Sequence, residues 1–160
     1  FSALNSECLN LIIREANSED MSALLELEQR VIEAERPFNS SIKTGKTHYY
    51  DLENLISSQD SCLIVVEVSG DIVATGYAKI QESKIAFNHD KHAYLGFMIV
   101  SPEHRGQGIN QTVMNHLIEW SKGRGITDLY LDVYSENESA IKAYRKAGFE
   151  PCLMEMKLSI

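Results

Sequence analysis

A strongly apolar segment that runs directly into a glycine-containing turn and a helix constrains this chain more than any other feature. Residues 91–100 (KHAYLGFMIV) are typical of a buried strand, which Ser101-Pro102 ends. After the turn SPEHRGQG, apolar residues recur every three or four positions from Ile109, as on a helix that packs against a core. Residues 127–135 (TDLYLDVYS) then alternate between apolar and polar side chains. This strand–helix–strand order predicts a right-handed crossover between parallel strands.

The other segments predict one α/β (α+β) domain over residues 1–160 with a mixed sheet, and nothing in the chain indicates a repeat or a long linker. Gly70 suits the tight turn of a hairpin, and Gly148 suits the end of a helix. The predicted strands are residues 8–16, 61–68, 71–80 and one or two within 149–160, and the predicted helices are residues 17–36, 47–58, 109–123 and 138–147.

Charge and composition narrow the choice of partners. The formal net charge of −8 disfavours nucleic acid and anionic membranes, because the surface as a whole repels phosphate. The three cysteines are widely separated and the five histidines show no ligand spacing, so we predict no metal and reduced thiols. The short apolar stretch LNLII matches neither a signal peptide nor a membrane span, which leads us to expect a cytoplasmic protein.

The turn SPEHRGQG is open to more than one interpretation. Two glycines between a strand and a helix are common in ordinary tight connections. A helix N-terminus with free amides, its positive dipole end and Arg105 also forms an anion site, for which phosphate is a natural ligand. No lysine follows Gly108 and Gln111 stands where a dinucleotide fingerprint has its third glycine, so both common nucleotide motifs are disfavoured.

With its flanking residues, this segment resembles the pyrophosphate loop of the GCN5-related N-acetyltransferase (GNAT) superfamily, whose pattern is [RQ]-x-x-G-x-[GA] after a strand with V-x-P. Asn110 departs from the pattern, since a small residue is usual at the last position. The matching residues are Val100, Pro102, Arg105, Gly106, Gln107, Gly108 and Ile109.

A second segment, NESAIKAYRKAGFE, resembles the superfamily's N-x-x-A-x-x-x-Y-x-x-x-G-F motif near the C-terminus. Asn137 and Tyr144 lie two helical turns apart on one predicted face. A capping Asn and a core Tyr would explain the same residues, but the glycine loop upstream favours the functional interpretation.

The resemblance implies a mixed, mostly antiparallel sheet of six to seven strands with a central, splayed parallel pair and about four helices. It implies an N-acetyltransferase that moves an acetyl group from acetyl-CoA directly to a primary amine of a small molecule, amino acid or peptide. By resemblance, Tyr144 protonates the leaving thiolate and Asn137 contacts the donor, and the family's frequent dimers make a homodimer an option. The implied acetyl-CoA contacts are Met98, Ile99, Val100, Arg105, Gly106, Gln107, Gly108, Ile109, Asn110, Asn137 and Tyr144.

The acceptor side and the general base are less constrained. The loop of residues 33–41 lies where the family covers the acceptor pocket, so Glu35 could bind the substrate ammonium and Phe38 could form a wall. No residue is assigned as the base, although Glu35, Tyr134 and Glu155 are candidates. Two alternatives stay open, a non-catalytic acyl-CoA-binding module and a nucleotide-binding regulatory domain.

Overall fold

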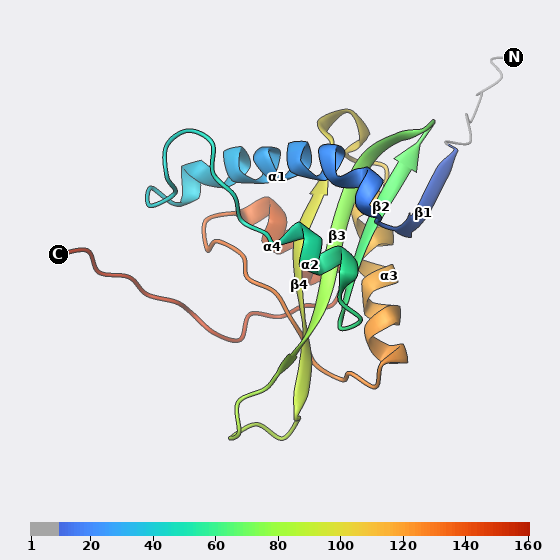
Figure 1. Cartoon of the computed structure of the whole chain (residues 1–160). Helices are drawn as coiled ribbons and strands as arrows, with labels where there is room; N and C mark the ends of the chain where they lie inside the picture. Colours follow the sequence, from blue (N-terminus) through green and yellow to red (C-terminus); the bar gives the residue numbers. More distant parts are fainter. Residues whose placement is uncertain (1–9) are drawn as a thin grey trace, which may run out of the picture.

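The computed structural model describes residues 10–160, in which five strands form one sheet in the order β1-β2-β3-β4-β5 (Figure 1). Three of the four pairings are antiparallel, and only β4 and β5 run parallel. The strands are β1 (Leu11–Glu15), β2 (Ser61–Val68), β3 (Asp71–Glu82), β4 (Lys91–Val100) and β5 (Leu129–Tyr130). The mixed, mostly antiparallel character predicted from the sequence is therefore confirmed.

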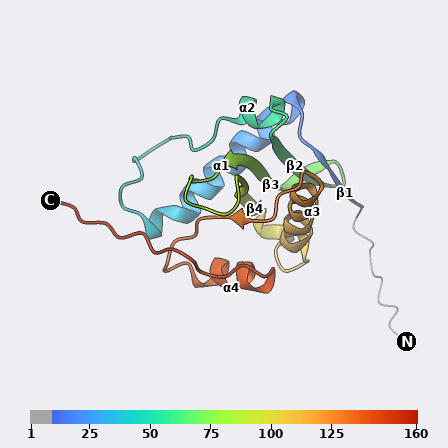
Figure 2. The ribbon, with the colours of Figure 1, turned by 90° about the horizontal axis from the view of Figure 1, so that it is seen from below.

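Helices cover both faces of this sheet (Figure 2), with α1 and α2 on one side and α3 and α4 on the other. Leu24, Leu27 and Leu55 belong to a buried cluster on the first face, and Val113 and Leu117 belong to another on the second. The α-helices are α1 (Met21–Glu35), α2 (Leu52–Ser57), α3 (Ile109–Gly123) and α4 (Glu138–Lys146), and the 3-10 helices are η1 (Ser18–Asp20), η2 (Arg36–Phe38) and η3 (Pro102–His104). Among residues 10–160, no helix combines the length and apolar character that crossing a bilayer requires.

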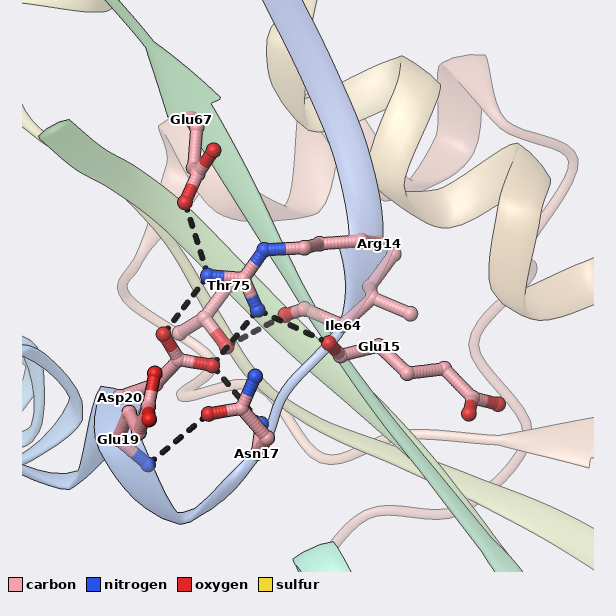
Figure 3. A network of polar contacts seen from close by, with 8 residues as sticks. All are labelled: Arg14, Glu15, Asn17, Glu19, Asp20, Ile64, Glu67 and Thr75. Atoms are coloured by element: carbon pink, nitrogen blue, oxygen red, sulfur yellow. Dashed lines mark hydrogen bonds and ion pairs between the residues drawn. The ribbon is translucent and has the colours of Figure 1, made fainter. Parts of the chain in front are cut away.

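An ion-paired network fixes the approach to α1 (Figure 3). The Arg14 guanidinium donates to both carboxylate oxygens of Asp20, at 2.7 and 2.8 Å, and to Oε1 of Glu67 at 2.8 Å. Asp20 also accepts the backbone N–H of Asn17, whose own side chain accepts the N–H of Glu19. These bonds connect β1, the helix start and β2, because each charge has a partner on another element.

A β-bulge interrupts the pairing of β3 with β4. The register shifts between Thr75 and Tyr77, which pair with Ile99 and Gly96. Gly76 of β3 therefore lies opposite two β4 residues instead of one. Phe97, one of these two residues, has a left-handed φ of 56° although it is not glycine, and its side chain is buried. A bulge of this kind bends the strand and redirects the residues that follow it. The bend falls just before Met98, Ile99 and Val100, the three residues expected to contact the acyl donor.

Strand β5 is much shorter than the sequence pattern predicts. It pairs with β4 only at Ala93–Leu129 and Tyr94–Tyr130, although β4 continues to Val100. The two parallel strands therefore separate after this contact, as expected for a splayed pair. They lie at an edge of the sheet, however, so the prediction of a central pair is wrong.

The predicted count of six to seven strands is also wrong for the described residues, because residues 149–160 form no strand. Residues 131–135 also lie outside any strand, which shortens β5. Both segments have polar and apolar residues at strand-like spacing, but alternation alone supplies no partner for the backbone N–H and C=O groups. The first strand and second helix start later than expected, at Leu11 and Leu52. Cys8 and Leu9 of the predicted first strand lie outside the described residues.

Candidate active site

The glycine loop between β4 and α3 has the backbone geometry that an anion site needs. Gly106 and Gly108 adopt φ angles of 77° and 79°, which glycine reaches without the steric cost that other residues meet. A Cβ at either position would meet no heavy atom within 4 Å, so the loop surface is open. The first backbone hydrogen bond of α3 runs from Thr112 N–H to Gly108 O. The N–H groups of residues 109–111 therefore have no acceptor within the helix.

The residues around this loop have different surroundings. Arg105 donates from Nε to the carbonyl of Val100 at 3.3 Å, which orients an exposed guanidinium beside the helix start. Ile109 is buried and anchors the first turn of α3, whereas Gln107 is exposed. Asn110 is half-buried, and within residues 10–160 its side chain makes no hydrogen bond. Its amide therefore stays available for an incoming ligand.

Helix α4 brings the second sequence motif next to the first. Nε2 of Gln111, in the first turn of α3, donates to the carbonyl of Ala143 at 3.2 Å, immediately before Tyr144. Asn137 caps α4 by accepting the N–H of Ala140 at 3.3 Å, which is the capping role that the sequence allowed. Burial, and after it the charge of Glu35, raises the pKa of Tyr144, so its hydroxyl keeps its proton at neutral pH.

The end of α1 and the start of its following loop contact the segment after β5. The Phe38 and Tyr134 rings stack with centroids 6.1 Å apart, and Nδ2 of Asn39 donates to the Tyr134 hydroxyl at 2.9 Å. Glu35 is half-buried at the last turn of α1, and this burial raises the pKa of its carboxyl. Glu35, Phe38 and Tyr134 therefore lie on one side of the site, with Glu35 in electrostatic reach of Tyr144.

Tyr49 and Tyr50, which sequence analysis placed in a helix without a role, extend this side of the site. The Tyr49 hydroxyl is buried and has no hydrogen-bond partner of normal geometry within residues 10–160, yet it lies near enough to Glu35 to oppose the effect of burial on the Glu35 pKa. Tyr50 stacks on Phe97 at the bulge of β4, with centroids 4.5 Å apart. The helix begins only after Asp51, whose side chain caps it, and this capping position was the available signal that the tyrosines precede it.

Glu28 holds the two tyrosines in place. Glu28 belongs to α1, and its side chain is completely buried. Its Oε2 accepts the backbone N–H groups of Tyr49 and Tyr50 at 3.1 and 3.0 Å. Oε1 lies 2.7 Å from Nδ1 of His48. A buried carboxylate requires such partners, because an unpaired one would lose its hydration without compensation. Sequence analysis missed this role, since Glu28 lies among ordinary acidic positions of a helix.

A cavity of about 180 Å³ lies between α2 and the sheet, beside this group. Its walls include Tyr49, Tyr50, Tyr77 and Tyr94, and the Tyr94 hydroxyl donates to Asp132 at 2.9 Å. Its other walls include Asp51 and Lys79, so the lining carries charges of both signs beside its aromatic surfaces and hydroxyl groups.

The fold is a mixed α/β sheet in which a glycine turn connects β4 to α3 beside a parallel pair that separates. Residues 12–149 match the model of the acetyltransferase (GNAT) family, and the chain belongs to this family. The streptothricin acetyltransferase of Streptomyces lavendulae is 34% identical over 95 residues, which are 59% of this chain and 47% of that protein. The chain covers less than two thirds of the length of each of the first three curated relatives that it matches.

Solved structures share the fold at lower identity. A Bacillus halodurans protein, solved as a tetramutant, superposes with a TM-score of 0.82 at 22% identity, over 93% of this chain and 99% of that one. A predicted acetyltransferase from Clostridium acetobutylicum, solved with acetyl-CoA, gives a TM-score of 0.71 at 19% identity, over 93% and 96% of the two chains. These likenesses concern the arrangement of helices and strands.

Proposed function

We propose that this acetyltransferase is an acetyl-CoA-dependent N-acetyltransferase that acts by direct transfer to a primary amine of a small molecule, amino acid or peptide. The observation that carries the proposal is the glycine loop, whose two left-handed glycines and free helix amides leave open space for a pyrophosphate at the end of β4. The solved Clostridium relative contains acetyl-CoA, which supports the choice of donor.

The residues present fit this donor. Gly106, Gln107, Gly108, Ile109 and Asn110 would offer backbone N–H groups to the pyrophosphate, and Arg105 would add a positive charge. Past Tyr94, β4 has no β5 partner, so the backbone of Met98, Ile99 and Val100 faces no strand on that side and would hold the pantetheine arm. The Val100 carbonyl already accepts from Arg105. Bound acetyl-CoA supplies the activated thioester. Asn137 caps α4 through its oxygen, and its amide nitrogen would remain for the donor.

The reaction requires a neutral amine and a proton for the departing sulfur. The amine nitrogen attacks the thioester carbonyl, the carbon–sulfur bond breaks, and the proton lost by nitrogen is balanced by the one gained by the thiolate. Glu35 would bind the arriving ammonium and accept its proton, for which a carboxyl of raised pKa is better suited than an ordinary one. Tyr144 would protonate the thiolate, since a phenol with a raised pKa is protonated at neutral pH.

The tyrosine side of the site would hold the rest of the acceptor. Phe38 and Tyr134 form one stacked wall, and Asp132, which accepts the Tyr94 hydroxyl, adds a negative charge two residues before Tyr134. These features favour acceptors that carry a second cationic group. The streptothricin acetyltransferase is similar in sequence, but its acceptor is not assigned to this chain.

Acetyl-CoA turnover, followed by thiol release with a broad panel of amines, tests the proposal. We expect micromolar binding of CoA by titration calorimetry and thiol release that depends on a primary amine. Tight CoA binding without turnover of any amine would favour the acyl-CoA-binding module instead. Binding of ATP or NAD without binding of CoA would contradict the proposal.

A further inference from the structure

Glu28 is a buried carboxylate to which the proposed chemistry assigns no step. Its side chain is 0% exposed, and three polar contacts surround it, all from the segment of residues 47–50. An apolar side chain of similar size would stabilise α1 as well, because a buried charge gives little net stability even when it is paired. The carboxylate therefore indicates a role in placing the segment that it contacts.

Glu28 fixes this segment at two consecutive backbone groups. Its Oε2 accepts the N–H groups of Tyr49 and Tyr50, and hydrogen bonds to an ionised carboxylate are among the stronger ones in proteins. The segment belongs to no helix or strand, so secondary structure does not determine where it lies. Nε2 of Gln29, also on α1, donates to the carbonyl of Thr47 at 2.7 Å but contacts neither tyrosine. Glu28 therefore determines the position of the two tyrosines.

The two tyrosine rings reach different parts of the site. Tyr50 stacks on Phe97 at the bulge of β4, with centroids 4.5 Å apart, next to the residues expected to hold the acyl donor. Tyr49 meets the Tyr50 ring edge-on, with centroids 5.7 Å apart, and its buried hydroxyl lies near Glu35. A shift of the Glu28 side chain would therefore move groups on both the donor and the acceptor side.

The spacing of the two carboxylates on α1 allows Tyr49 to connect them. Glu28 and Glu35 are seven residues apart, which corresponds to about two helical turns and about 10.5 Å along the axis, so both lie on one face. The Tyr49 backbone is bonded at the Glu28 end, and its hydroxyl lies at the Glu35 end. The Tyr49 side chain therefore spans these two turns, and the place of its hydroxyl depends on Glu28.

Tyr49 and Glu35 also affect each other's protonation. Burial, and after it Glu35, raises the pKa of Tyr49, so the phenol stays neutral and can donate a hydrogen bond. Burial raises the pKa of Glu35, and the Tyr49 hydroxyl opposes this effect, which favours the ionised carboxylate that accepts a proton. The other titratable groups in electrostatic reach of this pair are Arg36, Tyr50, Tyr134 and Tyr144.

We propose that Glu28 is a positioning residue for acetyl transfer, which holds the Tyr49 hydroxyl against Glu35 and thereby fixes that carboxylate where the amine arrives. This role rests on the proposed function, in which Glu35 accepts the proton of the amine. Glu28 acts only through Tyr49, because it is fully buried and both of its oxygens have protein partners. His48, whose side chain is 56% exposed, is the solvent-facing member of the arrangement.

Two substitutions of Glu28 test the positioning role. Glu28→Leu removes both acceptor oxygens, so kcat/KM for the amine should fall at least about tenfold, as the misplacement of a catalytic group causes. The acidic limb of its pH profile should move to higher pH, because Glu35 loses the hydroxyl that opposes the effect of burial on its pKa. Glu28→Gln retains an oxygen that can accept both N–H groups and should restore both quantities to near their wild-type values. The dissociation constant of CoA should change little in either variant, which indicates an intact fold.

Gln29→Met is the matched control for the segment. It removes the bond to Thr47 from the neighbouring position of α1 and should leave the acidic limb in place. An unchanged kcat/KM and acidic limb in Glu28→Leu would overturn the proposal. A Glu28→Gln variant as impaired as Glu28→Leu would also overturn it, because the acceptor oxygen would then not be the cause.

Measurements without substrates keep the proposal testable if Glu28→Leu does not fold. The amides of Tyr49 and Tyr50 should exchange slowly with deuterium in the wild-type chain, since Glu28 is their acceptor, and fast exchange would overturn the proposal. Tyr49→Phe keeps these backbone bonds, and carbon-13 NMR should show that its Glu35 titrates at higher pH than in the wild type. An unchanged titration of Glu35 would contradict the positioning role. Absence of acetyl transfer with this shift present would contradict the proposed function and leave the coupling of Tyr49 to Glu35 established.

Discussion

At the scale of single residues, Glu35 and Tyr144 carry the proposed chemistry from opposite sides of one site. They belong to helices far apart in the chain, and the charge of Glu35 contributes to the raised pKa of Tyr144. The carboxylate keeps the phenol protonated, and its own burial raises its affinity for a proton.

Tyr144→Phe tests the acid role. We expect kcat to fall roughly a hundredfold, because a positioned general acid contributes about that factor or more, while the dissociation constant of CoA changes little. Steady-state kinetics and calorimetry provide the two numbers. Tyr130→Phe is a suitable control, since it removes a tyrosine hydroxyl of β5 that bonds to His89 and does not belong to the proposed site. Full activity of the Tyr144 variant would remove the acid role.

Glu35→Gln tests the acceptor role. The KM for the amine should rise about tenfold, because a neutral amide binds an ammonium more weakly than a carboxylate. The acidic limb of kcat/KM in the wild-type enzyme should lie above pH ~4.3, the usual value for Glu, because burial raises the pKa of Glu35.

The Glu35 variant should lose that limb. Glu33→Gln, in the same turn but with a side chain 65% exposed, is the matched control. It should leave the KM for the amine and the acidic limb of kcat/KM unchanged. An unchanged KM and pH profile in the Glu35 variant would contradict the assignment.

At the scale of elements, the loop between β4 and α3 follows from local sequence, whereas the length of β5 does not. Gly106 and Gly108 permit a left-handed φ and Pro102 fixes φ at its own position, so these effects need no distant partner. Residues 131–134 alternate as well as those of any strand, but the pairing of β5 with β4 ends at Tyr94 and Tyr130. Their conformation thus depends on a partner that the local pattern cannot specify.

Gly108→Ala tests the loop as an element. A left-handed φ of 79° costs an alanine about 1 kcal/mol of stability, and a Cβ there would extend into the open space of the loop. We expect CoA binding to weaken at least tenfold, as measured by calorimetry.

Gly125→Ala is the matched control for the loop. Its φ is 77° and its surroundings are equally open, but it follows the other end of α3. It should lose similar stability and retain CoA binding. Equal CoA affinity in the two variants would exclude the loop as the pyrophosphate site.

At the scale of the whole molecule, the network of Arg14, Asp20 and Glu67 connects β1, β2 and the start of α1. Bonds to Arg14 hold the pKa of Asp20 below its usual range, so the folded state favours the ionised carboxylate. The resulting stability is present above pH ~4, where the unfolded chain also ionises, and is lost as pH falls through the lower folded pKa.

Asp20→Asn should therefore reduce the free energy of unfolding by about 2 kcal/mol at pH 7, the scale of hydrogen bonds to charged groups. The difference from the wild type should shrink as pH falls below ~4, which urea denaturation at several pH values measures. Glu26→Gln removes an exposed pair with Arg30 and should cost little at any pH. A pH-independent difference for Asp20 would show that the charge is not responsible.

The sequence by itself determined the family, the glycine loop, the two motif helices and most of the strands, because hydrophobic period, caps and positive φ act over a few residues. Asn137 caps α4, and Gly70 has the positive φ of the hairpin turn, as the sequence predicted. Only the tertiary structure decided the strand count, the edge position of β5, the buried role of Glu28 and the electrostatic effect of Glu35 on Tyr144. Each of these depends on which distant backbone or charge lies alongside, and local spacing contains no information about that.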